Sequence, residues 1–164
     1  MDAADASPLA PRARPIAAWL GPALIVGSVL FALRGFVLGG ALTNQHPDLL
    51  TFWLPRWAFL GDAIAGGTIP LWNPFEMAGY RFAADPQSGW LYVPPMLLFS
   101  TLSPGAALRT FIVLNPLLAG LGLYAFLRME TLGRAAATVG GLVLAMTMST
   151  STIAILLPFA GAIA

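Results

Sequence analysis

The sequence predicts an all-α membrane protein, with transmembrane helices and a long outward-facing loop that carries an amphipathic interfacial helix. The first observation is composition: 58% of the 164 residues are hydrophobic and only 9% are charged, whereas a soluble domain carries about 25% charged residues. The second is three long runs without a charged side chain, at residues 16–33, 110–127 and 135–159. The third is a polar, aromatic-rich segment between the first two runs, which is long for a simple connector.

Composition also excludes several kinds of site. The eight basic residues are all arginines, spread from Arg12 to Arg134, and the net charge is +1, so no cluster could follow a nucleic-acid backbone. With no cysteine, the chain has no disulfide, thiolate metal site or cysteine nucleophile, and its single histidine, His46, cannot build a metal centre alone. The chemistry that remains belongs to carboxylates, arginines, aromatic rings and amides.

The first predicted span covers residues 16–42, after a cytoplasmic tail at residues 1–15. As a helix, the uncharged part of this span would rise about 27 Å, close to the roughly 30 Å of a bilayer core. A cleaved signal peptide is the alternative, because Arg12 and Arg14 precede the run, but the apolar core of such a peptide usually has about 7–15 residues. We therefore expect an uncleaved anchor.

The second and third predicted spans cover residues 104–127 and 135–159. Asn115 and Pro116 lie in the middle of the second, where proline removes a backbone hydrogen bond. The third contains a serine and threonine run, whose hydroxyls can bond their own helix or a neighbouring one. Because the sequence stops soon after this apolar run, we expect an N-terminal portion of a longer polytopic chain.

The arginines indicate an orientation. Arg12 and Arg14 precede the first span, and Arg128 and Arg134 lie in the connector between the second and third, residues 128–134, so both flanks are expected in the cytoplasm. Residues 43–103 then face outward. This loop is acidic, and its charged residues are Asp48, Asp62, Glu76, Asp85, Arg56 and Arg81.

The first part of the loop, from about residue 48 to 65, has the pattern of an interfacial helix. Two glycines end it, and Pro55 is expected to bend it. At 100° per residue, Asp48, Arg56 and Asp62 lie within about 120° on a helical wheel. We therefore expect these charges to share one face, turned toward a watery cleft.

The second part of the loop is dense in proline, glycine and aromatic residues, which is typical of turns rather than of a helix or sheet. Pro94 and Pro95 then introduce a short apolar stretch, residues 96–102. It is too short to span a bilayer, so an interfacial or re-entrant segment is expected.

Several motifs of this loop stand in a fixed order. They are GTIPLWNP at residues 67–74, AGY at 78–80, ADPQSG at 84–89 and YVPP at 92–95, all after Asp48. This order resembles the first external loop of the YfhO family of bacterial polytopic membrane proteins, which are similar to GT-C glycosyltransferases. The resemblance implies transfer of a sugar from a polyprenyl-phosphate donor to a cell-envelope acceptor, at the outer face of the bacterial cell membrane.

The resemblance also implies a catalytic base, since GT-C enzymes carry an acidic residue in this loop close to the first span, and Asp48 matches it. A carboxylate there can take a proton from the acceptor hydroxyl. The alternative is that Asp48 only caps the following helix.

Three further residues are candidates for substrate binding. Arg56 and Arg81 could bind a lipid phosphate by paired hydrogen bonds, or could pair with carboxylates of the loop. Asp85 could bind substrate, or could cap its own Asp-Pro turn. No metal site is expected from these residues, and the need for a divalent metal cofactor is left open.

The sequence is therefore consistent with two functions. The first is a YfhO-like GT-C-type glycosyltransferase with Asp48 as its base. The second is a non-catalytic membrane protein that binds or moves lipid-linked sugars, or that scaffolds a partner enzyme.

Overall fold

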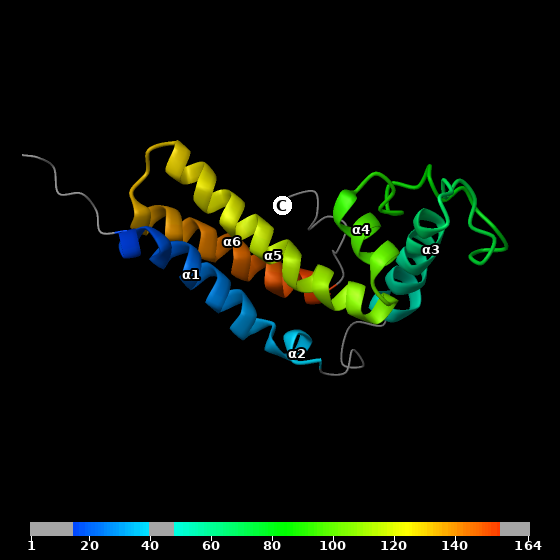
Figure 1. Ribbon diagram of the computed structural model, residues 1–164, viewed down its shortest axis with the longest axis horizontal. Coiled ribbons are helices and arrows are strands. Elements are labelled where there is room, and N and C mark those ends of the chain that lie inside the picture. Colours follow the sequence, from blue (N-terminus) through cyan, green and yellow to red (C-terminus); the bar gives the residue numbers. More distant parts are fainter. Residues whose placement is uncertain (1–14, 40–47, 155–164) are drawn as a thin grey trace, which may run out of the picture.

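The computed structural model describes residues 15–39 and 48–154, and in this part of the chain every regular element is a helix. The one strand-like feature of these residues is an isolated bridge between Asn73 and Tyr80. The all-α prediction is therefore confirmed for the fold class. Figure 1 shows a bundle of long helices with a smaller lobe, residues 48–101, at one end.

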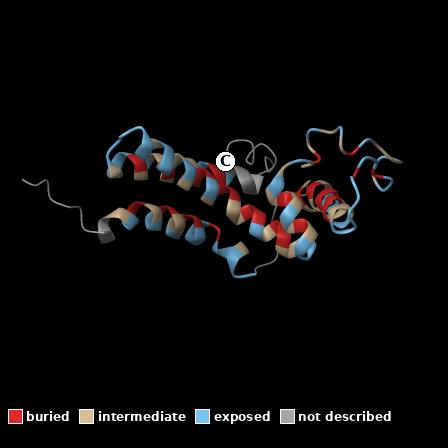
Figure 2. Cartoon of the chain, turned by 45° about the horizontal axis from the view of Figure 1, so that its top comes forward, coloured by how far each residue is buried: buried red, intermediate tan, exposed pale blue. Residues whose placement is uncertain are grey.

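The bundle consists of α1 (Pro15–Ala32), α5 (Pro104–Met129) and α6 (Arg134–Ala154). A turn at residues 130–133 reverses the chain, so that α5 and α6 pack as an antiparallel pair, with α1 beside them (Figure 1). In Figure 2 the buried residues of α1 lie along the side that faces the other two helices, and the opposite side is exposed. That outer surface is strongly apolar, since Trp19, Leu24 and Phe31 of α1 are exposed there.

The long helices can be compared with the predicted spans. Among the described helices, α5 alone is long and apolar enough to cross a membrane, judged by length and composition. It covers residues 104–127 and continues to Met129. Helix α6 covers the described part of residues 135–159, and residues 155–159 lie outside the described residues.

Residues 16–42 do not form one continuous helix, contrary to the sequence-based expectation. α1 ends at Ala32, and a short helix, α2 (Arg34–Val37), follows after Leu33. The Arg34 guanidinium donates a hydrogen bond to the carbonyl of Phe31 at 2.9 Å. In a continuous helix that carbonyl would accept the N–H of Gly35, and glycine is a poor helix former. Residues 40–42 lie outside the described residues.

Two glycines allow α5 and α6 to approach closely. A Cβ placed at Gly120 of α5 would lie 2.9 Å from the carbonyl oxygen of Gly141 in α6 and 2.7 Å from the Cβ of Ala145. A Cβ at Gly141 would lie 2.7 Å from the carbonyl oxygen of Gly120. Small residues at such crossings are typical of helix pairs in membranes.

The lobe begins with a helical stretch of two parts. A π-helix, η2 (Leu49–Trp53), leads into α3 (Leu54–Ala65), as expected for an interrupted helix over residues 48–65. Pro55 has no N–H to donate to the carbonyl of Thr51, and the wider turn of η2 lies immediately before it. An irregular segment, residues 66–92, then leads to α4 (Val93–Thr101). Pro94 and Pro95 lie in the first turn of α4.

A cluster of aromatic rings joins the lobe to the bundle. Trp57 of α3 is fully buried, with its ring centroid 5.6 Å from Phe99 of α4 and 4.8 Å from Phe111 of α5. In addition, the Tyr92 hydroxyl donates to the Asn115 side chain in α5 at 3.1 Å. The lobe is therefore packed against the end of α5 through both its helices.

Candidate functional site

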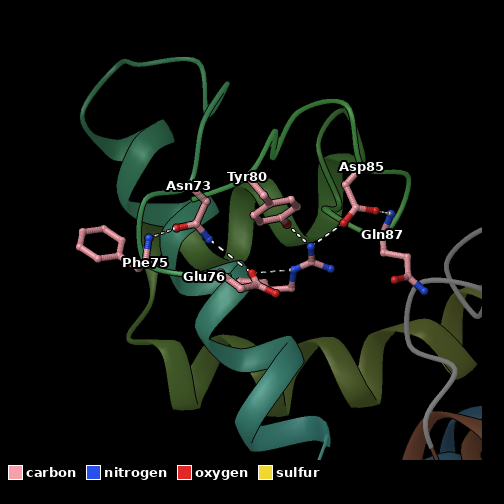
Figure 3. Close-up of polar contacts among 7 residues, drawn as sticks. Asn73, Phe75, Glu76, Tyr80, Asp85 and Gln87 are labelled. Atoms are coloured by element: carbon pink, nitrogen blue, oxygen red, sulfur yellow. Dashed lines mark hydrogen bonds and ion pairs between the residues drawn. The ribbon is translucent and has the colours of Figure 1, made fainter. Parts of the chain in front are cut away.

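The polar centre of the lobe is a buried arginine that three segments of the chain surround. Arg56 of α3 donates from Nε to Glu76 Oε2 at 3.1 Å, and from Nη2 to Asp85 Oδ2 at 2.5 Å and to the hydroxyl of Tyr80. Figure 3 shows Glu76, Tyr80 and Asp85 converging on this point from the irregular segment. We call these four residues the Arg56 cluster.

Burial makes this cluster electrostatically strong. The Arg56 side chain is 3% exposed, and its guanidinium lies 4.3 Å from the ring centroid of Phe52 and 4.9 Å from that of Tyr80. Burial by itself would lower the pKa of Arg56, but the hydrogen bond to Asp85 and the neighbouring acidic groups outweigh it, so the pKa is raised. The pKa of Tyr80 is raised to about 12, chiefly by burial and partly offset by the charge of Arg56.

Local turns hold the acidic members of the cluster in place. Asp85 Oδ1 accepts the N–H of Gln87 at 2.8 Å, while Oδ2 of the same carboxylate pairs with Arg56. Asn73 Oδ1 accepts the N–H of Phe75 at 3.0 Å, and its amide donates to Glu76 at 3.5 Å (Figure 3). Each carboxylate is thus fixed from its own turn as well as by the arginine.

The turn that carries Glu76 has an unusual backbone. Met77 and Ala78 have φ of 51° and 59°, in the left-handed region that side chains disfavour, and Gly79 has φ of 102°. Gly79 also lies under the Trp72 indole, where a Cβ would lie 2.7 Å from the ring. The bridge between Asn73 and Tyr80, with both N–H···O distances at 3.0 Å, closes this turn.

A cavity of about 350 Å³ opens beside the cluster, and we call it the α3 cavity. Arg56, Asp62 and Glu76 are its charged lining residues. Phe52, Phe59, Phe75, Thr51, Pro55, Ala58 and Asn73 complete the lining. Arg56 and Asp62 thus lie on the same face of α3 and line the same cavity, as the helical wheel predicts.

Asp48 lies apart from this cavity. It is half-buried directly before η2, its own backbone is helical (φ −58°, ψ −26°), and its side chain makes no capping hydrogen bond to η2. A π-helix has more residues per turn than an α-helix, so it changes the angular position of Asp48 relative to the wheel. Asp48 is not among the residues that line the α3 cavity.

The other predicted site residues divide into two groups. Arg56 and Asp85 come together in an ion pair, which is the alternative stated for Arg56, and Asp85 also accepts the N–H of Gln87 in its own turn, which is the alternative stated for Asp85. Arg81 does not join them, because its side chain is exposed and makes no ion pair with the described residues. His46 lies outside the described residues.

Several polar residues of this region were missed by the sequence interpretation. Tyr80 and Asn73 stand in the sequence only as members of the AGY and GTIPLWNP motifs, yet the Tyr80 hydroxyl accepts from Arg56 and the Asn73 amide donates to Glu76. Asn115 is fully buried and its Nδ2 has no hydrogen-bond partner among the residues that the structure describes, while its Oδ1 accepts from Tyr92. Burial raises the pKa of Tyr92. In the sequence, the one sign of the hydrogen bond between Tyr92 and Asn115 is that Asn115 is a polar residue within an apolar run.

A second, more apolar cavity of about 450 Å³ lies between α2, the end of α1 and the N-terminal half of α5. Arg109 is its charged lining residue. The other lining residues are Leu30, Phe36, Val37, Gly39, Ala106, Thr110, Val113, Leu114 and Leu117. An elongated apolar molecule with an anionic end would match this combination.

The described residues hold no group of three or more histidine, aspartate or glutamate side chains placed to bind a metal ion. No family model, curated protein or solved structure matches this chain.

Proposed function

We propose that this chain is the N-terminal part of a YfhO-like, GT-C-type membrane glycosyltransferase, which transfers a sugar from a polyprenyl-phosphate donor to a cell-envelope acceptor. The proposal rests chiefly on one observation: the sequence motifs that resemble the YfhO family come together in space. Tyr80 of AGY and Asp85 of ADPQSG both bond Arg56, and Asn73 of PLWNP bonds Glu76 in the same cluster. The motif residues therefore serve one polar centre in the lobe.

The proposal places the bundle in the bacterial cell membrane as a multi-pass unit, with the lobe on the outer side. The exposed apolar side chains of the three long helices support this placement, including Phe126 of α5 and Val143 of α6. Within α1 there is no charged residue, and the charges of α5 lie near its ends, at Arg109 and Arg128. Lipid is the environment that such a surface favours.

For the donor, we assign the lipid-phosphate end to the outer end of α5. The cavity that Arg109 lines combines apolar walls with one guanidinium group. Such a cavity could hold the first isoprene units of the lipid while the arginine binds the phosphate. Arg81, exposed on the lobe, is a further arginine proposed for the phosphate, whereas Arg56 is engaged by Glu76 and Asp85.

For the chemistry, Asp48 acts as the base. Its carboxylate takes the proton of the acceptor hydroxyl as that oxygen forms a bond to the anomeric carbon of the donor sugar. The bond from the anomeric carbon to the phosphate oxygen breaks, and its electron pair leaves with the lipid phosphate. Arginine side chains stabilise the negative charge on that leaving group.

Replacement of Asp48 tests the proposal in the full-length protein. Asp48→Asn should reduce incorporation of sugar into the envelope acceptor by at least about 100-fold, the usual contribution of a general base. Expression and membrane insertion should not change. Glu130→Gln, in the turn between α5 and α6, is the matched control and should keep full activity. Retained activity in Asp48→Asn would rule out the assignment.

One observation favours the non-catalytic alternative, in which the lobe is a docking or scaffold surface. Arg56, the best-placed cation of the lobe, is fully buried against two carboxylates and so is not offered to a substrate phosphate. If Asp48→Asn keeps sugar transfer while deletion of the lobe abolishes it, the scaffold function is favoured.

A further inference from the structure

The exposed side of α3 carries two adjoining cavities. Next to the α3 cavity, of about 350 Å³, there is a second hollow of about 430 Å³. Phe59, Asp62 and Phe75 line both, so they form a shared wall. Trp72 lines the second hollow. Together the two hollows offer room for a ring-sized molecule with a substituent.

The charge that this site presents to solvent is negative. Arg56 is 3% exposed and is engaged by Glu76 and Asp85, so its positive charge is neutralised inside the lobe. Asp62 is exposed, and its side chain makes no hydrogen bond or ion pair with the described residues. Both hydrogen bonds that Glu76 accepts end on Oε2. The hollows are therefore lined by two carboxylates, Asp62 in both and Glu76 in the α3 cavity, and by one guanidinium, Arg56, which is 3% exposed and whose Nη1 makes no hydrogen bond with the described residues. With Asp85 counted, three carboxylates oppose this one cation, so the net charge of the site is negative.

Aromatic rings flank these carboxylates. Phe59 and Phe75 meet edge to face, with ring centroids 6.3 Å apart. The backbone N–H of Phe75 is held by the Asn73 side chain, and Figure 3 shows its ring directed away from the polar cluster. The faces of aromatic rings attract cations, as do carboxylates. An anion would be repelled by both features, and a neutral molecule would gain from neither charge.

We propose that the two hollows form one binding site for an organic cation, in which a protonated primary amine on a ring-sized body lies between the Asp62 carboxylate and the rings of Phe59 and Phe75. Glu76 accepts a second hydrogen bond from the ammonium group. A metal ion is a poorer match, because the described residues hold no cluster of three ligating side chains and the walls are aromatic. The site is independent of the proposed glycosyl transfer, since it does not use Asp48.

The test compares two probes of equal size, benzylamine and benzyl alcohol, which differ in charge near neutral pH. The full-length protein in nanodiscs of zwitterionic lipid is titrated with each, with empty nanodiscs as the blank. Bound probe is measured by equilibrium dialysis, and the change in tryptophan fluorescence that is lost in Trp72→Phe serves as a second readout. Benzylammonium should bind about tenfold more tightly than the alcohol, as expected for one carboxylate together with a cation–π contact.

Variants locate the binding. Asp62→Asn should weaken benzylammonium binding about fivefold or more and leave the alcohol unchanged, whereas Asp62→Glu should keep most of the affinity. Because Asp62 is exposed, neither variant should disturb folding. Glu130→Gln, at the opposite end of α5, should have no effect on either probe. Equal affinity for the two probes, or unchanged amine binding in Asp62→Asn, would overturn the proposal.

Discussion

At the residue scale, Arg56 links α3 to the irregular segment of the lobe. The side chain crosses from α3 to two turns that lie 20 and 29 residues further along the chain. The buried guanidinium is stabilised by Glu76, Asp85 and Tyr80, which bond its Nε and Nη2, and by two aromatic rings that cover its faces, while its Nη1 makes no hydrogen bond within the described part of the chain. Removing it leaves two partly buried carboxylates facing each other without a counter-charge.

Arg56→Met should therefore lower the free energy of unfolding of the lobe by about 3 kcal/mol, which is typical of breaking a buried ion pair. Arg56→Lys should lower the free energy of unfolding by less than Arg56→Met does, because lysine keeps the positive charge. It should still destabilise the lobe, since one ammonium group cannot bond both carboxylates and the tyrosine in this geometry. Denaturant unfolding followed by tryptophan fluorescence measures the change. The control is Arg81→Met. Because the Arg81 side chain is exposed, this variant should change the free energy of unfolding by less than about 0.5 kcal/mol. Equal stability of the Arg56→Met and Arg81→Met variants would contradict a structural role for Arg56.

Tyr80 gives the cluster a pH dependence on the alkaline side. Its pKa is raised from 10.0 to about 12, chiefly by burial. Between these values the unfolded chain releases the phenolic proton while the folded lobe keeps it. The stability that depends on the protonated phenol is therefore complete below pH 10 and is lost as the pH rises through about 12.

We expect the unfolding free energy of the lobe to fall across this range more steeply in the natural chain than in Tyr80→Phe, which has no phenol to ionise. Denaturant midpoints measured at several alkaline pH values give the two slopes. Identical slopes would show that Tyr80 titrates as it does in the unfolded chain.

At the element scale, the sequence predicts helices well and their interruptions less well. Long uncharged runs and the prolines at helix starts indicate α5, α6 and α3, because these signals are local. At the break after α1, Arg34 contacts a backbone carbonyl, and no periodicity reveals such a contact. The Arg56 cluster could not be predicted for a related reason, since Glu76 and Asp85 reach the arginine from two separate turns, one of which has left-handed backbone at Met77 and Ala78.

The crossing of α5 and α6 gives a matched pair of glycine replacements within one helix. At Gly120 a Cβ would lie within 3.0 Å of Ala145, Gly141 and Ile25 atoms, whereas at Gly122 nothing lies within 4 Å. Gly120→Ala should therefore destabilise the bundle by about 1–3 kcal/mol through overpacking. Gly122→Ala should be neutral or slightly stabilising, because alanine favours helix.

Unfolding of the purified protein in detergent, followed by circular dichroism, separates these two variants. If both glycines tolerate alanine equally, the close crossing at Gly120 and Gly141 is not a feature of the bundle in solution.

At the scale of the whole molecule, the bundle and lobe differ in the surface they present. The bundle is apolar outside, while the lobe carries the acidic residues and the cavities. The proposed orientation follows from this contrast together with the arginines at the turn between α5 and α6. In the proposed orientation, the lobe and that turn are placed on opposite sides of the bilayer.

Thiol labelling tests this arrangement, because these 164 residues contain no cysteine and a single thiol introduced among them is compared with the same protein without it. In intact cells, Phe75→Cys on the lobe should react with a membrane-impermeant thiol reagent, since this side chain is 86% exposed. Glu130→Cys, in the turn between α5 and α6, should react only after the membrane is permeabilised. Leu118→Cys, on the exposed side of α5 near its middle, should stay unreactive in both states, because lipid excludes the charged reagent. Reaction of Leu118→Cys in intact cells, or equal labelling of the lobe and the turn before permeabilisation, would contradict a membrane-embedded bundle with an outward lobe.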